Sequence, residues 1–257
     1  MKFTNRKIIL GAPGLVQSTS RGMHDFIYRV STVKDAQFNV GDVVDLGDRE
    51  FTYSKSASAL NTGLGCSFSS TGYVAYTAAA VAAAVKATEI TVPAATHDAL
   101  TEDYLAGGYV LLMTSGLVET RKIVGNQAVA ANVAFKIQLD AGLSVAITAG
   151  TTGVEVYENP YAALTASGSV ALAKAGVPAT TVAATATYFW CQTKGFIFVS
   201  PQAGITAGQN GACWRHDGSL DTLDNGIEDD ETYVSSQIAG FAAIGSADGN
   251  GPLFKLT

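Results

Sequence analysis

Short apolar segments separated by turn residues are the feature that most limits the fold of this chain. Tyr109–Met113 and Leu117–Val124 flank the tripeptide Thr-Ser-Gly, in which Gly116 stands where a hairpin loop of this length needs a left-handed residue. Val133–Leu139 and Leu143–Thr148 flank Asp-Ala-Gly in the same way. Strands this short and this closely spaced are typical of antiparallel β-proteins. We therefore predict an all-β fold, a sandwich or barrel of short antiparallel strands.

One segment has helical propensity. Thr77–Glu89 is rich in Ala, the best helix former, and places Val81 and Val85 one helical turn apart. It runs directly into a β-type segment that ends at Pro93. The fold should therefore contain at most one short Ala-rich helix, and the alternative is an extended connection in its place.

The N-terminal residues show no clear hydrophobic period. We expect residues 1–31 to form an extended N-terminal arm and residues 32–257 to form a β-rich body. This body is either one domain or two small β subdomains that divide near residue 160.

Charge is distributed unevenly along the chain. Through residue 34 there is a single acid, Asp25, against six bases: Lys2, Arg6, Lys7, Arg21, Arg29 and Lys34. From Asp217 to Glu231 there is no base among seven acids: Asp217, Asp221, Asp224, Glu228, Asp229, Asp230 and Glu231. The two clusters either attract each other, within one molecule or between copies, or form two separate solvated faces.

Composition excludes several classes of partner. The net charge of −6 gives no overall field that would attract nucleic acid or an anionic membrane, and no uninterrupted apolar stretch reaches the ~20 residues that span a bilayer.

The basic start resembles a secretory signal, but Gly11, Pro13 and Gly14 interrupt its apolar run, so we expect no export. Charged residues make up only 15% of the chain, against about 25% in average domains, which suits a protein packed against other proteins or a secreted β-domain.

The stretch from Cys213 to Asp217 contains a thiol, an indole, a guanidinium, an imidazole and a carboxylate. Asp217-Gly218 favours a type I′ turn, which would place the stretch on a hairpin strand. Side chains alternate along a strand, so Cys213 and His216 should point to opposite faces and cannot form a local nucleophile–base pair. A distant approach by His24 or His97 is the alternative.

The remaining polar patterns predict no catalytic residue, no metal and no cofactor. Three widely spaced cysteines, Cys66, Cys191 and Cys213, fit neither a disulfide framework nor a zinc site, and indicate buried thiols in a reducing compartment. The acidic run 221–231 lacks the EF-hand spacing, which leaves a solvated turn or an irregular calcium site. Glu155 and Glu158 should face opposite ways on a strand. No phosphate-binding loop or serine nucleophile elbow is present, so we expect no enzyme.

Several β segments in order resemble a known class of proteins. The segments are Phe51–Gly63, Ala106–Asn126, Phe135–Thr148, Glu158–Tyr161, Thr187–Val199 and Ile238–Thr257. Together they resemble virion structural proteins of tailed bacteriophages, in particular capsid decoration or head cement proteins. The resemblance covers most of the chain from Phe51 onward. The resemblance implies a β-rich, non-enzymatic protein on a phage head, assembled in the host bacterial cytoplasm. It carries over no catalytic residue.

We expect such a protein to bind the major capsid protein across subunit seams and to form a closed homo-oligomer, a homotrimer, without nucleic acid or membrane partners. The cationic arm is the expected contact, because an extended segment can add to a sheet edge while its bases meet acids. The expected contact residues are Lys2, Arg6, Lys7, Arg21 and Arg29.

Three alternatives stay open. One is a phage receptor-binding or fibre protein that would hold host surface glycan with exposed aromatic residues such as Tyr157, Tyr161 and Trp214. The others are a secreted adhesin-like subunit and a hydrolase on a β scaffold.

Overall fold

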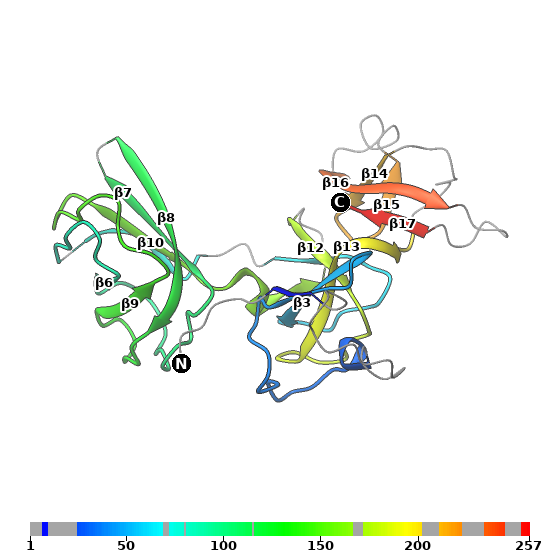
Figure 1. The fold of residues 1–257 in the computed structure, drawn as a ribbon, viewed down its shortest axis with the longest axis horizontal. Coiled ribbons are helices and arrows are strands. Elements are labelled where there is room, and N and C mark those ends of the chain that lie inside the picture. The colour runs from blue at the N-terminus through cyan, green and yellow to red at the C-terminus, as the bar shows by residue number, and fades with distance from the viewer. Residues whose placement is uncertain are drawn as a thin grey trace. The chain divides into compact units, whose positions relative to one another are not determined.

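The computed structural model describes residues 7–9, 25–68, 72–79, 81–114, 116–166, 172–201, 211–222, 234–244 and 253–257. These residues are nearly all β, as the sequence predicts, and they divide into two compact units (Figure 1). The described part of unit 1 lies within residues 70–160, and that of unit 2 lies within residues 6–69 and 161–257. Besides a division at residue 160 there is thus a second one at residue 69, and unit 1 is inserted into the sequence of unit 2.

Unit 1 is a curled antiparallel sheet. Its described strands follow the spatial order β5-β10-β7-β8-β9-β6. Their bounds are Val74–Ala78 for β5, Glu89–Val92 for β6, Tyr109–Thr114 for β7, Leu117–Asn126 for β8, Phe135–Leu139 for β9 and Gly153–Tyr157 for β10.

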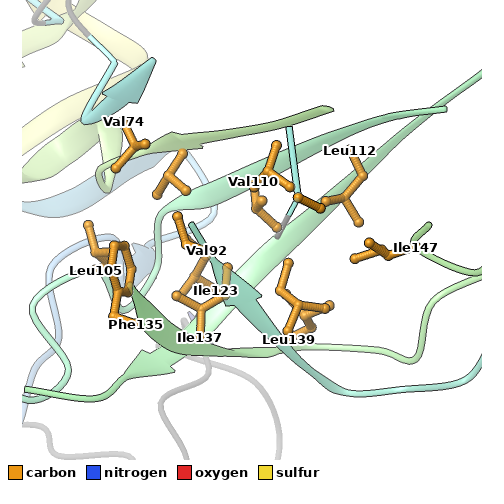
Figure 2. Packing of buried hydrophobic residues seen from close by; sticks show 14 of the residues in the cluster. Val74, Val92, Leu105, Val110, Leu112, Ile123, Phe135, Ile137, Leu139 and Ile147 are labelled. Carbon is orange, nitrogen blue, oxygen red and sulfur yellow. The ribbon is translucent and has the colours of Figure 1, made fainter. Parts of the chain in front are cut away.

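One face of this sheet carries the core of unit 1. In β9 the buried side chains Phe135, Ile137 and Leu139 alternate with exposed ones, the period that a strand with one solvated face requires. Figure 2 shows these side chains gathered with those of the neighbouring strands. Burying each large apolar side chain stabilises the fold by roughly 1.5–3 kcal/mol, so unit 1 has a core of its own.

The hairpin predicted around Gly116 is confirmed. β7 and β8 pair in antiparallel register from Tyr109↔Lys122 to Thr114↔Leu117. Because Thr114 is itself paired, the loop has two residues and not the predicted three. Gly116 has a φ of 89°, in the left-handed region as predicted.

The second predicted hairpin is wrong. β9 pairs with β8 and β6, and Leu143–Thr148 forms no strand beside it. Instead the Leu143 and Ile147 side chains are buried in the core, and the Ser144 N–H and hydroxyl bind the Glu119 carboxylate of β8 at 3.0 and 2.7 Å. These distant partners hold the segment away from β9.

The Ala-rich segment forms the extended connection and not the helix. Its backbone bonds to the segment just described: Ala83 and Ile147 form a bridge, and the Lys86 N–H donates to the Leu143 carbonyl at 2.8 Å. Intrinsic helix propensity is a weak preference, and these pairings outweigh it.

Unit 2 is built on a second, larger sheet. Its main path is β1-β2-β3-β13-β17-β16-β14-β15, and β4, β11 and β12 branch from it. All described pairings between these strands are antiparallel except β1 with β2. The bounds are Lys7–Ile9 for β1, Val43–Asp45 for β2, Arg49–Lys55 for β3, Cys66–Ser67 for β4, Thr165–Ala166 for β11, Lys174–Pro178 for β12, Tyr188–Phe198 for β13, Ala212–Arg215 for β14, Leu220–Thr222 for β15, Val234–Ile244 for β16 and Leu253–Leu256 for β17.

The described end of the predicted arm is packed into unit 2. Residues Asp25–Tyr28 form a 3₁₀ helix, η1, whose Ile27 is buried, and the Phe26 ring meets Trp190 edge-on at a centroid distance of 5.4 Å. Ser31 and Tyr188 exchange two backbone hydrogen bonds, at 3.0 and 2.7 Å. β1, at Lys7–Ile9, is a strand of the same unit, so the described residues of the predicted arm belong to the body of unit 2. A second 3₁₀ helix, η2, spans Pro160–Ala163.

The two ends of unit 1 lie next to each other. β5, the first strand of the unit, pairs with β10, the last, in a register that places Val74 opposite Val156. The Tyr73 N–H also donates to the Val156 carbonyl at 2.8 Å. Cross-strand partners are about 5 Å apart, so the chain enters and leaves unit 1 at one place.

We predict that residues 72–160 fold when produced alone, because they contain a complete core and their ends are already paired. The fragment should show dispersed amide resonances and a cooperative urea transition. Ile137→Asp, which places a charge in the core, is the matched control and should abolish both. Random-coil amide shifts in the unsubstituted fragment would contradict the prediction.

Candidate interaction surface

Apolar side chains gather on the solvent face of three neighbouring strands of unit 2. We call Phe196, Phe198, Phe241, Leu253 and Lys255 the aromatic face. The sheet register places Lys255 of β17 between Phe196 of β13 and Phe241 of β16, and Leu253 opposite Phe198. The three rings expose 40%, 45% and 38% of their surface for Phe196, Phe198 and Phe241.

Lys255 makes cation–π contacts with two of these rings. Its ammonium lies 5.8 Å from the centroid of Phe196 and 5.9 Å from that of Phe241. Cation–π pairs at exposed sites are worth about 0.5–1 kcal/mol each, which favours this arrangement but leaves the outer ring surfaces in water. Clustered exposed aromatic side chains are typical of protein interaction sites.

The opposite face of the same strands is a packed core. Phe254, Leu256 and Ala239 are buried there, packed with Trp214 of β14. The aromatic face therefore stands on a rigid support, and it needs little reordering on binding.

A cavity of about 370 Å³ adjoins the aromatic face. Phe196 and Phe198 form one side, and its lining also includes Tyr28, Arg49 and Gly63. A Cβ atom at Gly63 would lie 3.3 Å from the Phe198 ring, so the absent side chain leaves room for this ring. The cavity extends the apolar surface with a pocket that a protruding side chain of a partner could fill.

Of the contact residues predicted in the arm, the structure describes the side chain of Arg29 alone. It is exposed and lines a cavity of about 360 Å³ with Val30, Val33 and Tyr188. Lys7 belongs to β1, for which the structure gives the backbone pairing. Lys2, Arg6 and Arg21 lie outside the described residues.

The stretch Cys213–Asp217 is a hairpin with a different turn from the one predicted. β14 and β15 pair, but Gly218 has a positive φ (88°) and Asp217 does not, which excludes type I′. The Gly218 N–H donates to the Arg215 carbonyl at 3.1 Å and the Arg215 N–H to the Ser219 carbonyl at 2.9 Å. This is a type I turn followed by a bulge at Gly218.

The turn chemistry accounts for Asp217. Its carboxylate accepts the N–H and the hydroxyl of Ser219 at 2.9 and 2.6 Å. Burial raises the pKa of this carboxyl, but the two hydrogen bonds and the charges of His216 and Arg215 outweigh burial and lower it overall. The Asp217 side chain therefore stabilises the turn between β14 and β15, as Asp side chains commonly do in turns.

Cys213 is not an activated nucleophile. It is buried, and its thiol lies 3.6 Å from the Asp221 carbonyl oxygen. Burial raises its pKa, and the Asp221 carboxylate, which pairs with Arg215 at 2.8 Å, adds to the effect. Both influences disfavour the thiolate. Trp214 is buried in the core of unit 2, which removes it from the glycan-binding set considered above.

The other two cysteines lie against each other. The sulfur atoms of Cys66 and Cys191 are 3.6 Å apart, and both residues are buried free thiols. Burial, followed by the contact with Cys66, raises the pKa of Cys191 well above its ordinary value. The structure thus places these thiols in the core, as the sequence predicts.

Glu155 and Glu158 each interact with a tyrosine. The Tyr104 hydroxyl donates to Glu158 at 2.8 Å, and a hydrogen bond to Glu155, with a smaller effect of burial, raises the pKa of Tyr157. The acidic run 221–231 lies outside the described residues except for Asp221 and Thr222. Within the described ranges, no three or more His, Cys, Asp or Glu side chains gather in a way that could hold a metal ion, and no helix is long and apolar enough to cross a membrane.

One buried polar pair was not predicted. The Lys174 ammonium of β12 donates to the Ser67 hydroxyl at 3.1 Å and to the His216 carbonyl at 3.0 Å. Burial lowers the pKa of Lys174 to about 8, although the charge of Asp217 acts in the opposite direction. A serine beside such a lysine resembles a nucleophile with its base. Ser67 and Lys174 are, however, only 0% and 5% exposed, so a substrate has no access to them. Their hydrogen bonds connect β4, β12 and the β14–β15 turn.

No family model matches this chain. No curated protein and no solved structure matches it either.

We predict that the stability contributed by Lys174 rises with pH. Below pH 8 the ammonium is charged in the folded and the unfolded chain, and the folded state bears the cost of burying it. Between about pH 8 and 10.4 the unfolded chain binds more protons, so the free energy of unfolding increases with pH. Relative to Lys174→Met, the wild type should gain roughly 2 to 3 kcal/mol over this range.

Urea unfolding of both proteins at several pH values measures this difference, because groups common to both cancel. A difference that stays flat from pH 7 to 10.5 would show that Lys174 titrates normally.

Proposed function

We propose that this chain is a non-enzymatic structural protein of a tailed-phage virion that binds the outer capsid surface across subunit seams and stabilises the head. The aromatic face of unit 2 carries the proposal as the contact surface. The resemblance of the ordered β segments to head decoration proteins and the low charged fraction of 15% support it.

The mechanism needs no chemistry. A protein that binds the assembled shell and not the separated subunits stabilises the shell by mass action. One aromatic face is small, at or below the ~800 Å² per partner of a standard interface. A closed homotrimer would present three such faces, and a molecule held at one point is at high effective concentration for the next.

The arm is the second contact in this proposal. Arg29 is exposed beside η1 and is placed to meet an acidic partner. β1 joins the edge of its own sheet in parallel with β2, whereas the arm hypothesis uses the edge of a neighbouring molecule. For this reason the aromatic face, and not the five bases of the arm, is the primary contact.

We predict that Phe196→Ser and Phe241→Ser each weaken binding to capsid shells about 30-fold, because buried aromatic contacts at interface centres contribute about 2 kcal/mol or more. Both rings are exposed, so the fold should persist. The measurement is co-sedimentation of the purified protein with phage heads stripped of it, over a concentration series.

Tyr109→Ser is the matched control, since Tyr109 of unit 1 is also 36% exposed and has a lysine, Lys122, 6.0 Å from its ring centroid. It should bind as the wild type does. If the two phenylalanine variants occupy heads as fully as the control, the aromatic face is not the contact.

A further inference from the structure

Unit 1 contains a polar and aromatic cavity that the capsid proposal does not use. It measures about 450 Å³, and its lining includes Tyr73, His97, Asp98, Tyr104, Asn132 and Glu158. This volume is within the range of small-molecule sites. We propose that the cavity binds a neutral or amino sugar of a glycan chain.

Two tyrosine rings supply the apolar wall. Tyr104 is 51% exposed, and its ring centroid lies 5.8 Å from that of Tyr73 with the planes at 47°. Aromatic rings with one face open to solvent are suited to the C–H face of a pyranose, which is apolar while its rim carries hydroxyls.

Hydrogen bonds hold both rings in place before a ligand arrives. The Tyr104 hydroxyl donates to Glu158 at 2.8 Å, and the Tyr73 hydroxyl donates to the Asp98 carbonyl at 3.1 Å. Burial, followed by the bond to Glu158, raises the pKa of Tyr104 far above its ordinary value, so the phenol stays neutral. Rings fixed in this way lose little freedom on binding.

The floor beside the rings is also fixed. The two ring nitrogens of His97 lie 2.6 Å from the Asp98 carbonyl and 2.9 Å from the Val133 carbonyl. The backbone N–H of His97 donates to the Asn132 side-chain oxygen at 3.1 Å. Asn132 has a φ of 60°, a left-handed conformation that Asn tolerates better than most residues. The turn at Asn132 is thereby held against the histidine.

The polar groups around the cavity match a ligand that both donates and accepts hydrogen bonds. Among the described residues, the second carboxylate oxygen of Glu158 and both of Asp98 make no hydrogen bond, and neither does the side-chain nitrogen of Asn132. They offer acceptors and a donor at one rim, and sugar hydroxyls satisfy both kinds.

Charge narrows the ligand class. Two carboxylates and no lysine or arginine line the described cavity, so phosphorylated, sulfated or sialylated sugars are repelled. A quaternary ammonium group would suit the rings and the carboxylates, but the group itself neither accepts a hydrogen bond from the Asn132 amide nor donates one to the carboxylates. A neutral hexose or an amino sugar fits all three groups.

This inference goes beyond the proposed function and does not rest on it, since every lining residue belongs to unit 1. It also uses other residues than the glycan-binding alternative drawn from the sequence, which named Tyr157, Tyr161 and Trp214, because none of these three lines the cavity.

The test is saturation-transfer difference NMR with the full-length protein and a panel of glucose, galactose, N-acetylglucosamine, glucosamine and their short oligomers, with sialic acid and choline as comparison ligands. We expect transfer from tyrosine ring protons to at least one neutral or amino sugar. Tyr104→Ala should weaken that binding at least 10-fold, and Asp98→Asn at least 3-fold. Tyr104→Phe keeps the ring and should bind more tightly than Tyr104→Ala.

Tyr109→Ala, an exposed tyrosine of the same unit outside the cavity, is the matched control and should bind as the wild type does. Each variant is first checked for the wild-type urea midpoint. The proposal is overturned if no sugar of the panel binds, if Tyr104→Ala binds as Tyr109→Ala does, or if choline or sialic acid binds more tightly than every neutral and amino sugar.

Discussion

The backbone ladder between β3 and β13 is the constraint on which unit 2 depends. It runs from Tyr188↔Lys55 to Gly195↔Arg49 and joins chain segments that lie on either side of unit 1 in the sequence. Such distant pairing is costly in loop-closure entropy. The β5–β10 pairing reduces this cost, because it brings the two ends of the insertion together. β13 then has two functions: its first half carries Phe189 and Trp190 into the core, and its second half carries Phe196 and Phe198 to solvent.

Local turn chemistry made part of this fold predictable. Gly116 specifies the β7–β8 loop by its conformation alone, and the all-β class follows from many such signals. The hairpin predicted for Leu143–Thr148 was wrong because a strand-like pattern does not specify which segment it pairs with. Contacts with Glu119 and with the Ala83 backbone, both distant in sequence, determine where this segment lies. The Ala-rich segment failed as a helix for the same reason, and Asp217-Gly218 shows that one dipeptide supports two turn types.

The candidate sites were harder to predict than the fold. Phe196 and Phe198 are two residues apart on a strand, so the sequence predicts that they share one face. It does not say which face of that strand meets solvent. The cavity proposed to bind sugar is lined by Tyr73, His97, Tyr104 and Glu158, which only the tertiary structure brings together. Conversely, the residue cluster that looks most reactive in the sequence, Cys213 to Asp217, is accounted for by packing and turn formation.

The adjacent ends of unit 1 have a consequence for how such a protein diversifies. A module whose own two ends meet at one cross-strand pair, Val74 opposite Val156, can be exchanged between lineages as a single piece of gene, with the host sheet left intact. Under the functions proposed above, selection can then alter the ligand of unit 1 while the aromatic face of unit 2 stays constant.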